Sequence, residues 1–368
     1  MKKLISLLLL FLSGIALPVT TVSYDSDGML LINGQRTFII GTYHLPKSEN
    51  PYAELADAGF NLLRVGGSVE EFDHAELAGL KVWHTLGTLD LEDLEQSSKR
   101  LTDKVLKFKN HPALIIWESV DEPAWTWLKA EPRIGPEPFA QAYRLIKSLD
   151  PYHVLYMNHA PVNLVSTLQK YNAGTDIVAC DIYPVIPHGI KTMYALFPDG
   201  MQGDLSNTTI SQVGEYTDKM RKVAGPDRPV FMVLQGFAWE MLRKEQERDS
   251  SKILYPTYEQ FRFMAYNAII HGTNGIVYWG TFYTPQPSEF WSDLKRVTTE
   301  LGDLQDVLAA RTIPLNLDHT YYEMGHSLDK GVERIAKQWE NKIYLLTANA
   351  DKNPVKVSFS GLKDLKGS

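Results

Sequence analysis

The stretch ALIIWESVDEPAW, residues 113–125, begins as an apolar run and ends in three carboxylates, a proline and a tryptophan. Its continuous apolar half is typical of a strand that is covered on both faces, as in a parallel sheet. Glu118, Asp121 and Glu122 therefore stand at the end of a predicted buried strand. Glu118 still lies within that strand, and we expect it to be a buried structural carboxylate.

Seven further β-rich runs share this character, and segments with helical periodicity separate them. The eight runs are TFIIGTY (37–43), GFNLLRV (59–65), GLKVWHTL (79–86), ALIIWES (113–119), HVLYMNH (153–159), DIVACDIY (176–183), PVFMVLQGF (229–237) and GIVYWGTF (275–282). Eightfold alternation of strand and helix predicts an α/β protein with a (β/α)8 TIM barrel. A doubly wound open sheet is the alternative, but no run is followed by a glycine-rich phosphate turn.

The two ends of the chain differ from the barrel pattern. Residues 1–20 predict a signal peptide, because two lysines precede the apolar run LISLLLLFL (4–12); an N-terminal anchor is the alternative. The barrel is predicted over 21–313, with LLINGQRTFII (30–40) as a hairpin that caps its floor. Alternating apolar and polar residues predict a small β-domain over 314–368. Its strands are too few for a sandwich, so it is either truncated or packs on the barrel.

Composition narrows the classes of function. A net charge of −7 without a basic block argues against nucleic acid as a partner. Cys180 is the single cysteine, so an intrachain disulfide and a thiolate metal cluster are excluded, and we expect it in the core. The histidines show no paired metal-binding spacing, and we expect neither a metal nor another cofactor. The predicted leader implies a secreted or periplasmic bacterial protein without stable membrane insertion after cleavage.

Polar and aromatic residues gather at the predicted strand ends, where a barrel builds its site. This pattern favours a carbohydrate, whose hydroxyl groups need hydrogen-bond partners and whose C–H faces stack on aromatic rings. The candidate substrate-binding residues are Tyr43, His44, Arg64, His84, Asp121, Asn158, Tyr183, Gln235 and Trp279. The candidate stacking tryptophans are Trp125, Trp127, Trp239, Trp279 and Trp291.

The motif WESVDEP (117–123) resembles the Trp-x-x-x-Asn-Glu-Pro signature of the retaining (β/α)8 glycoside hydrolase clan, which includes cellulases, β-mannanases and β-galactosidases. AGFNLLR (58–64), HPALIIW (111–117) and RPVFMVLQGF (228–237) resemble other strands of this clan, in the same order. The resemblance implies that Glu122 is the general acid/base. It further implies that Arg64 and Tyr183 bind a nucleophilic carboxylate and that Trp279 stacks on sugar.

Two positions depart from the clan pattern. Asp121 replaces the usual asparagine, and an anion there would raise the pKa of Glu122. Gln235 stands where the nucleophilic glutamate should be, and an amide cannot form a glycosyl ester. One hypothesis is that Asp181, or as second choice Glu240, supplies the second catalytic carboxylate.

Two other hypotheses remain for the missing nucleophile. The substrate's own acetamido group attacks, or the barrel binds glycans without cleaving them. The sequence therefore predicts an exported glycoside hydrolase that cleaves O-glycosidic bonds of an oligo- or polysaccharide, with a catalytically inactive glycan-binding barrel as the alternative.

Overall fold

The computed structural model describes residues 19–125, 131–188, 194–196, 202–204, 209–323, 331–351 and 353–361. Nearly all of the predicted signal peptide and the candidate Trp127 lie outside the described residues. Within the described ranges, we find no helix with the length and apolarity that crossing a bilayer requires.

Eight parallel strands close into a barrel, in the order β12-β13-β4-β5-β6-β7-β8-β9. Each lies within one of the eight predicted runs, so the predicted fold class is confirmed. The strands are β4 (Ile39–Thr42), β5 (Leu62–Val65), β6 (Lys81–Thr85), β7 (Leu114–Glu118), β8 (Val154–His159), β9 (Ile177–Ile182), β12 (Val230–Gln235) and β13 (Gly275–Trp279).

A helix follows each barrel strand. These are α1 (Pro51–Asp57), α2 (Val69–Leu77), α3 (Leu94–Phe108), α4 (Glu137–Leu149), α5 (Val165–Gln169), α6 (Gln212–Ala224), α7 (Tyr258–Ile270) and α8 (Glu289–Asp303). The start of α2 is fixed by a capping box, in which Ser68 and Glu71 each accept a backbone N–H of the other residue. Short elements lie in the loops: η1 (Lys170–Gly174), β10 (Tyr194–Leu196), β11 (Gln202–Asp204), η2 (Trp239–Leu242), η3 (Glu245–Glu247), η4 (Ser250–Lys252), η5 (Thr281–Tyr283) and α9 (Gln305–Ala309).

Successive side chains of each barrel strand point alternately into the barrel and toward the helices. On β8, Tyr156 packs in the interior cluster, whereas Leu155 and Met157 pack in the outer layer. Cys180 on β9 packs in the outer layer and is fully buried, which confirms its predicted place in the core. This alternation decides which residues reach the mouth of the barrel.

A three-stranded antiparallel sheet closes the floor of the barrel. It consists of β1 (Val22–Tyr24), β2 (Leu30–Ile32) and β3 (Gln35–Thr37). Val22 and Leu30 join the interior cluster, so the hairpin predicted to cap the floor does so. The turn at Gly28 has a φ of +79°, and a Cβ there would lie 2.8 Å from the carbonyl oxygen of Arg228. Glycine is needed there both for the backbone conformation and for the close approach.

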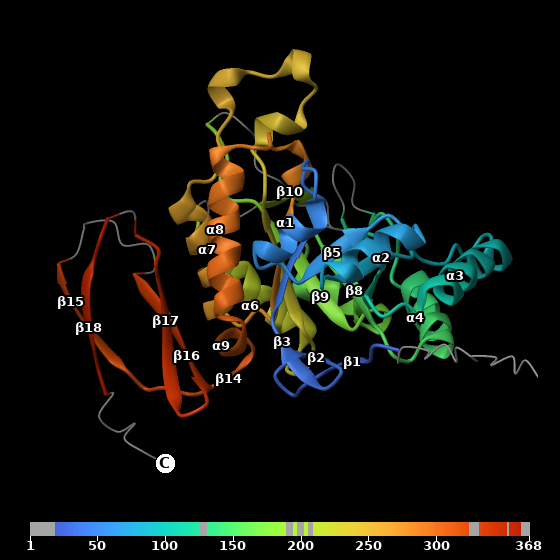
Figure 1. Ribbon diagram of the computed structural model, residues 1–368, viewed down its shortest axis with the longest axis horizontal. Helices are drawn as coiled ribbons and strands as arrows, with labels where there is room; N and C mark the ends of the chain where they lie inside the picture. Colours follow the sequence, from blue (N-terminus) through green and yellow to red (C-terminus); the bar gives the residue numbers. More distant parts are fainter. Residues whose placement is uncertain are drawn as a thin grey trace, which may run out of the picture.

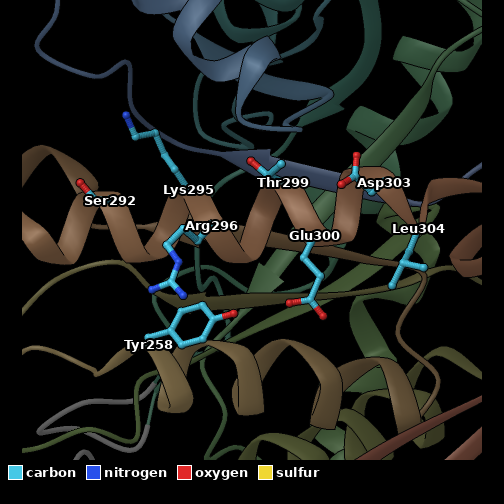
Figure 2. Close-up of a pocket in the computed structure, with 8 residues that line it drawn as sticks. All are labelled: Tyr258, Ser292, Lys295, Arg296, Thr299, Glu300, Asp303 and Leu304. Atoms are coloured by element: carbon cyan, nitrogen blue, oxygen red, sulfur yellow. The ribbon is translucent and has the colours of Figure 1, made fainter.

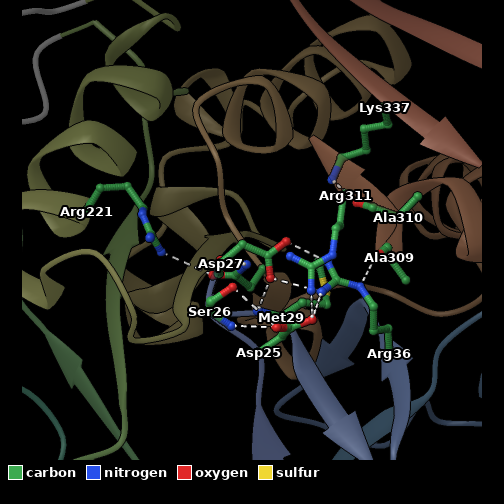
Figure 3. Close-up of polar contacts among 11 residues, drawn as sticks. Asp25, Ser26, Asp27, Met29, Arg36, Arg221, Ala309, Ala310, Arg311 and Lys337 are labelled. Atoms are coloured by element: carbon green, nitrogen blue, oxygen red, sulfur yellow. Dashed lines mark hydrogen bonds and ion pairs between the residues drawn. The ribbon is translucent and has the colours of Figure 1, made fainter. Parts of the chain in front are cut away.

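A network of charged groups ties this floor to the C-terminal strands (Figure 3). Arg36 donates to Asp25 and Asp27, each at 2.6 Å, and to the last carbonyl of α9 at 2.7 Å. Arg311 also donates to Asp25 at 2.6 Å. Lys337 is buried and donates to the carbonyl that follows α9 at 3.0 Å. The network therefore couples the first strands of the chain to those that follow the barrel.

The C-terminal strands pack on one side of the barrel (Figure 1). They are antiparallel: β14 (Arg311–Thr312), β16 (Val332–Trp339) and β17 (Lys342–Asn349) form one sheet, and β15 (Asp318–Glu323) pairs with β18 (Lys356–Ser360). Leu346 and Ala348 of β17 belong to the main hydrophobic core. Among the described residues, this region therefore packs on the barrel. The first of these strands starts three residues before the predicted boundary at 314.

An ion-pair triad joins this small β region to the barrel helices. His271, at the end of α7, lies 3.0 Å from Asp218 of α6 and 3.1 Å from Glu333 of β16. Burial alone would lower the pKa of His271, but the hydrogen bonds and charges of Asp218 and Glu333 raise it to about 9.

The His271 triad predicts a pH-dependent stability. Because the folded pKa lies above the unfolded value of about 6.5, the triad stabilises the protein fully below that pH, and this contribution is lost as pH rises through about 9. We expect His271→Gln to flatten the decline in unfolding free energy over this window, measured by urea denaturation. His74→Gln on exposed α2 is the matched control and should keep the wild-type slope. An unchanged slope in His271→Gln would contradict the assignment.

Candidate active site

A cavity of about 190 Å³ opens at the carboxyl ends of the barrel strands. Acidic and amide groups form one part of its wall and aromatic rings the rest. It is lined by Tyr43, Asp121, Glu122, Trp125, Asn158, Asp181, Tyr183, Val233, Phe237, Trp239, Leu242 and Trp279. The volume is below the ~300–1,000 Å³ of typical ligand pockets, so the described part suits a single sugar ring better than a long chain.

Three carboxyl groups meet in this cavity around one amide. Asn158 on β8 donates from Nδ2 to Asp121 at 2.9 Å and to Asp181 at 3.2 Å. Glu122 and Asp181 are hydrogen-bonded to each other. The backbone N–H of Glu122 also donates to the carbonyl of Asn158 at 3.0 Å. Residues from three neighbouring strands are thereby held in one cluster.

Glu122 has a strained backbone. Its φ is +45°, in the left-handed region that side chains with a Cβ rarely adopt. Such residues persist only where the surrounding structure holds them, and they concentrate at functional sites. Here the hydrogen bond to Asn158 and the buried carboxyl contacts hold Glu122 in place. A local strain of this kind has no signature in the sequence.

The pKa values of the three carboxyl groups are all raised. Burial is the largest cause in each, because removal from water disfavours the charged form. For Glu122, the charges of Asp181 and Asp121 raise the pKa further, well above the ordinary range for glutamate. The hydrogen bond between Glu122 and Asp181 raises the pKa of Glu122 and opposes the rise in that of Asp181. Of the two groups, Glu122 therefore keeps its proton to the higher pH.

Arg133 folds back over the cavity from the loop between β7 and α4. Its guanidinium donates to Glu122 at 3.3 Å and lies 4.5 Å from the centre of the Trp125 ring. Its side chain is 44% exposed, so this ion pair borders solvent. Arg133 therefore partly offsets the negative charge of the acid cluster, and it contacts Glu122, the residue predicted to be the general acid.

The aromatic wall is built by the ends of β9, β12 and β13. Tyr183 stacks on Trp279, with ring centres 5.7 Å apart and an interplanar angle of 26°. Phe237 packs edge-on against Trp279 at 5.1 Å, and the indole N–H of Trp239 donates to the Tyr183 carbonyl at 3.3 Å. These contacts hold the rings rigidly, as a stacking surface for a sugar requires.

Arg64 holds a different carboxylate from the one that the clan resemblance implies. Its Nε donates to Glu118 at 2.9 Å, and the Thr85 hydroxyl donates to the same oxygen. Glu118 is only 4% exposed, in agreement with its expected place as a buried carboxylate. Burial raises the pKa of Glu118, while Arg64 and Thr85 oppose that rise.

Gln235 is fully buried and is not among the residues lining the cavity. Its Oε1 accepts from the backbone N–H of Val185 at 2.9 Å. Its Nε2 donates to the carbonyls of Val185 and Phe237, each at 3.0 Å. The amide therefore joins the loops after β9 and β12, and both of its functional groups are needed there. This contact explains a glutamine at the position where the clan has a carboxylate.

The structure does not bring every candidate to the cavity. Glu240 turns away: its Oε1 accepts from the backbone of Asp249 at 2.7 Å. His84 points to the outer layer, because its neighbour Trp83 takes the inward position, and its Nδ1 lies 3.2 Å from the carbonyl of Val65. Trp291 lies on α8, where its N–H donates to Glu54. His44 contacts Trp279 edge-on from outside the lining residues. Glu240 and His84 are therefore removed from the candidate site.

Four contributors were missed by the sequence analysis. Val233 of β12 lines the cavity, Phe237 and Leu242 line it from the segment after this strand, and Arg133 reaches the acid cluster from a loop. The only available signal was the presence of Val233 and Phe237 in the run that resembles the nucleophile strand. Loop residues such as Arg133 have no periodicity that predicts where they fold back.

A larger hollow lies on the outer face, between α7 and α8 (Figure 2). Its polar groups pair with groups nearby: Arg296 lies over the Tyr258 ring at 3.9 Å, and Glu300 pairs with Arg262 at 2.8 Å. This groove is remote from the strand ends, and its main charges are already compensated. It is therefore a poor candidate for the site.

Fold and cavity together define the class, a (β/α)8 barrel protein with an acidic, aromatic-lined site at the strand ends. Residues 14–222, more than half of the chain, match the model of the TIM barrel domain of glycosyl hydrolases family 2. The chain belongs to this family, which confirms the resemblance inferred from the strand motifs.

Solved structures show the same fold at low sequence identity. The family 2 β-galacturonidase from Eisenbergiella tayi, bound to galacturonate, is 16% identical with a TM-score of 0.50, over 76% of this chain and 54% of that one. A mutant of the glycoside hydrolase family 5 mannosidase from Rhizomucor miehei is 14% identical with a TM-score of 0.54, over 78% and 99%. The chain thus spans about half the length of the β-galacturonidase. No curated protein sequence matches the chain.

The backbone contacts of Gln235 predict how the protein responds when the clan's carboxylate is introduced at this position. We expect Gln235→Glu to lower the free energy of unfolding by about 2–5 kcal/mol, because two buried carbonyls lose their donor and face an anion. Urea denaturation measures this change. Gln246→Glu, the same change on an exposed turn, should stay within about 0.5 kcal/mol of wild type. Unaltered stability together with a gain in glycoside turnover would refute the structural role of Gln235.

Proposed function

We propose that this chain is a glycoside hydrolase with Glu122 as its general acid/base. The observation that carries the proposal is the placement of Glu122 and Asp181 together in an aromatic-lined cavity at the carboxyl ends of the barrel strands. A general acid in glycoside cleavage must keep its proton until it donates it to the leaving oxygen. Family membership supports the reaction class, and the raised pKa of Glu122 supports the assigned role.

Asp181 is the proposed second carboxylate. It faces Glu122 directly, whereas Glu240 lies outside the cavity and Gln235 is an amide. In the reaction, protonated Glu122 donates to the glycosidic oxygen as the bond between this oxygen and the anomeric carbon breaks. Asp181 either bonds to the anomeric carbon, in an ester that water then hydrolyses with Glu122 as the base, or takes a proton from the water that attacks this carbon directly. The hydrogen bond between the two groups has to open when a sugar enters. A final separation of about 5–5.5 Å corresponds to retention, and ~6.5–9.5 Å to inversion.

A glycan-binding barrel without catalysis is the second candidate function. The observation in its favour is Gln235, whose amide is fixed by three backbone contacts where the clan has its nucleophile. Such a protein would keep the aromatic wall of the cavity and use the carboxylates only as acceptors. Binding of several glycans without cleavage of any would identify this second function.

Export is proposed from the sequence alone. Lys2, Lys3 and the apolar run at residues 4–12 have the order of a signal peptide. The proposed location is therefore the periplasm or the cell exterior. Expression with and without residues 1–20, followed by fractionation, tests it: only the full chain should leave the cytoplasm.

Substitution of the two proposed catalytic carboxylates tests the mechanism. We expect Glu122→Gln to lower kcat about 10²–10⁴-fold while the glycan still binds, because the amide cannot donate the same proton. Hydrolysis of a panel of aryl glycosides and binding calorimetry measure the two effects. Glu245→Gln, an exposed carboxylate on η3, is the control and should keep wild-type kcat. Full activity in Glu122→Gln would exclude it as the acid.

The pH profile tests the coupling between the two groups. Burial and the Asp181 charge keep Glu122 protonated to unusually high pH, so the alkaline limb of kcat should lie well above the range of an ordinary carboxyl. Asp181→Asn removes a negative charge and should lower the pKa of Glu122. Because this variant also lacks the proposed second catalytic carboxylate, the pKa of Glu122 is followed by NMR titration of its carboxyl carbon in both proteins and not by kcat. The charges of Asp121 and Arg133 also face Glu122 and remain in the variant. An unchanged pKa of Glu122 in the variant would show that Asp181 does not act on Glu122.

A further inference from the structure

The cavity offers many more hydrogen-bond acceptors than donors. Asp121, Glu122 and Asp181 contribute carboxyl oxygens. The Nδ2 group of Asn158 already donates to Asp121 and to Asp181. Asn158 is 5% exposed, and its Oδ1 accepts no hydrogen bond from the described residues. Because the Nδ2 faces two carboxylates, the orientation of the amide is determined. A buried acceptor of this kind is normally hydrogen-bonded, so Oδ1 is available to a donor on a ligand or on a water molecule.

The charge of the cluster is only partly balanced. When Glu122 is protonated, Asp121 and Asp181 are the two groups of the cluster that carry negative charge once ionised. In the described part of the chain, Arg133 is the one cation that pairs with any of the three acids, and its partner is Glu122. Arg64, the other nearby cation, is paired with Glu118. Besides burial, the charge of Asp121 raises the pKa values of both Glu122 and Asp181, so like charges face one another in this cluster.

The aromatic wall also favours a cation. Electron-rich faces of tryptophan and tyrosine attract ammonium and guanidinium groups. Arg133 already shows this preference, since its guanidinium lies between the Trp125 ring and the Glu122 carboxylate. Tyr183 and Trp279 extend the ring surface across the cavity. The site therefore combines anionic acceptors with aromatic faces, the two features that hold a cationic ligand.

We propose that the sugar bound in this cavity is a cationic amino sugar, whose ammonium group contacts Asp121, Asp181 and the free Oδ1 of Asn158. This inference rests on the proposed function, since it names the substrate class of the same site. An ammonium supplies three donors and one positive charge, whereas a neutral hydroxyl supplies one donor and no charge. A uronic acid, with its own carboxylate, would be repelled by the acid cluster.

Binding calorimetry with four monosaccharides tests the preference on the full chain. Glucosamine, N-acetylglucosamine, glucose and glucuronic acid differ in charge and in donors while sharing the pyranose ring. We expect glucosamine to bind at least about tenfold more tightly than glucose, as a charge-assisted hydrogen bond implies, and glucuronic acid to bind most weakly. Equal or tighter binding of glucose, N-acetylglucosamine or glucuronic acid would overturn the proposal.

Substitutions test whether Asp121 is responsible for the expected preference for glucosamine over glucose. Asp121→Asn should reduce the advantage of glucosamine over glucose about tenfold or more, because it removes one of the negative charges. Glu245→Gln removes one exposed charge outside the cavity and should keep the preference. A thermal melt of each variant verifies that it is folded. Preference retained in folded Asp121→Asn would contradict the proposed contact.

Hydrolysis distinguishes this inference from the proposed function. Both anomers of the 4-nitrophenyl glucosaminides and glucosides are incubated with the wild-type chain. Cleavage of glucosides with equal or higher kcat/KM overturns the inference and leaves the glycoside hydrolase function intact. Tight glucosamine binding without cleavage of any glycoside supports the inference as a binding preference and defeats the enzymatic proposal. Absence of both binding and cleavage overturns the two together.

Discussion

Closure of the parallel sheet is the constraint on which the rest of the structure depends. β9 pairs with β12 and β13 pairs with β4, so all eight strands present their carboxyl ends at the same rim. The acid cluster is a direct result, because β7, β8 and β9 are consecutive neighbours in the barrel. Glu122 follows β7, Asn158 ends β8 and Asp181 ends β9. Residues about sixty positions apart in the chain thereby come into hydrogen-bond contact.

The barrel could be predicted from sequence because its strands are continuous apolar runs that alternate eight times with segments of helical period. The inner or outer position of a rim residue was harder to predict, because continuous apolar runs do not reveal which face of the strand each residue takes. His84 illustrates the difficulty: it directly follows the inward Trp83 and so points to the helices. By contrast, Asp181 and Asn158 lie inward and line the cavity. A difference of one position along a strand thus determines whether a side chain faces the cavity or packs against the helices.

Contacts made by loops could not be predicted at all. Arg133 meets Glu122 across a segment with no periodic pattern, and Glu240 turns away from the cavity through its contact with Asp249. Gln235 is instructive in another way. Its replacement of a catalytic carboxylate was evident from the motif, but its use as a bridge between two loops required the coordinates. The sequence thus showed that position 235 carries an amide, but it did not show which backbone groups this amide contacts.

The left-handed backbone at Glu122 has a consequence for directed evolution. A non-glycine residue in this conformation costs roughly 1–2 kcal/mol, which glycine would not incur. Selection of a variant library for heat resistance alone would therefore enrich glycine at this position and discard the carboxyl. Selection for turnover would retain the strained glutamate. At position 122, the residue that favours thermal stability thus differs from the residue that the proposed reaction needs. A more stable form of this barrel has to gain its stability at other positions.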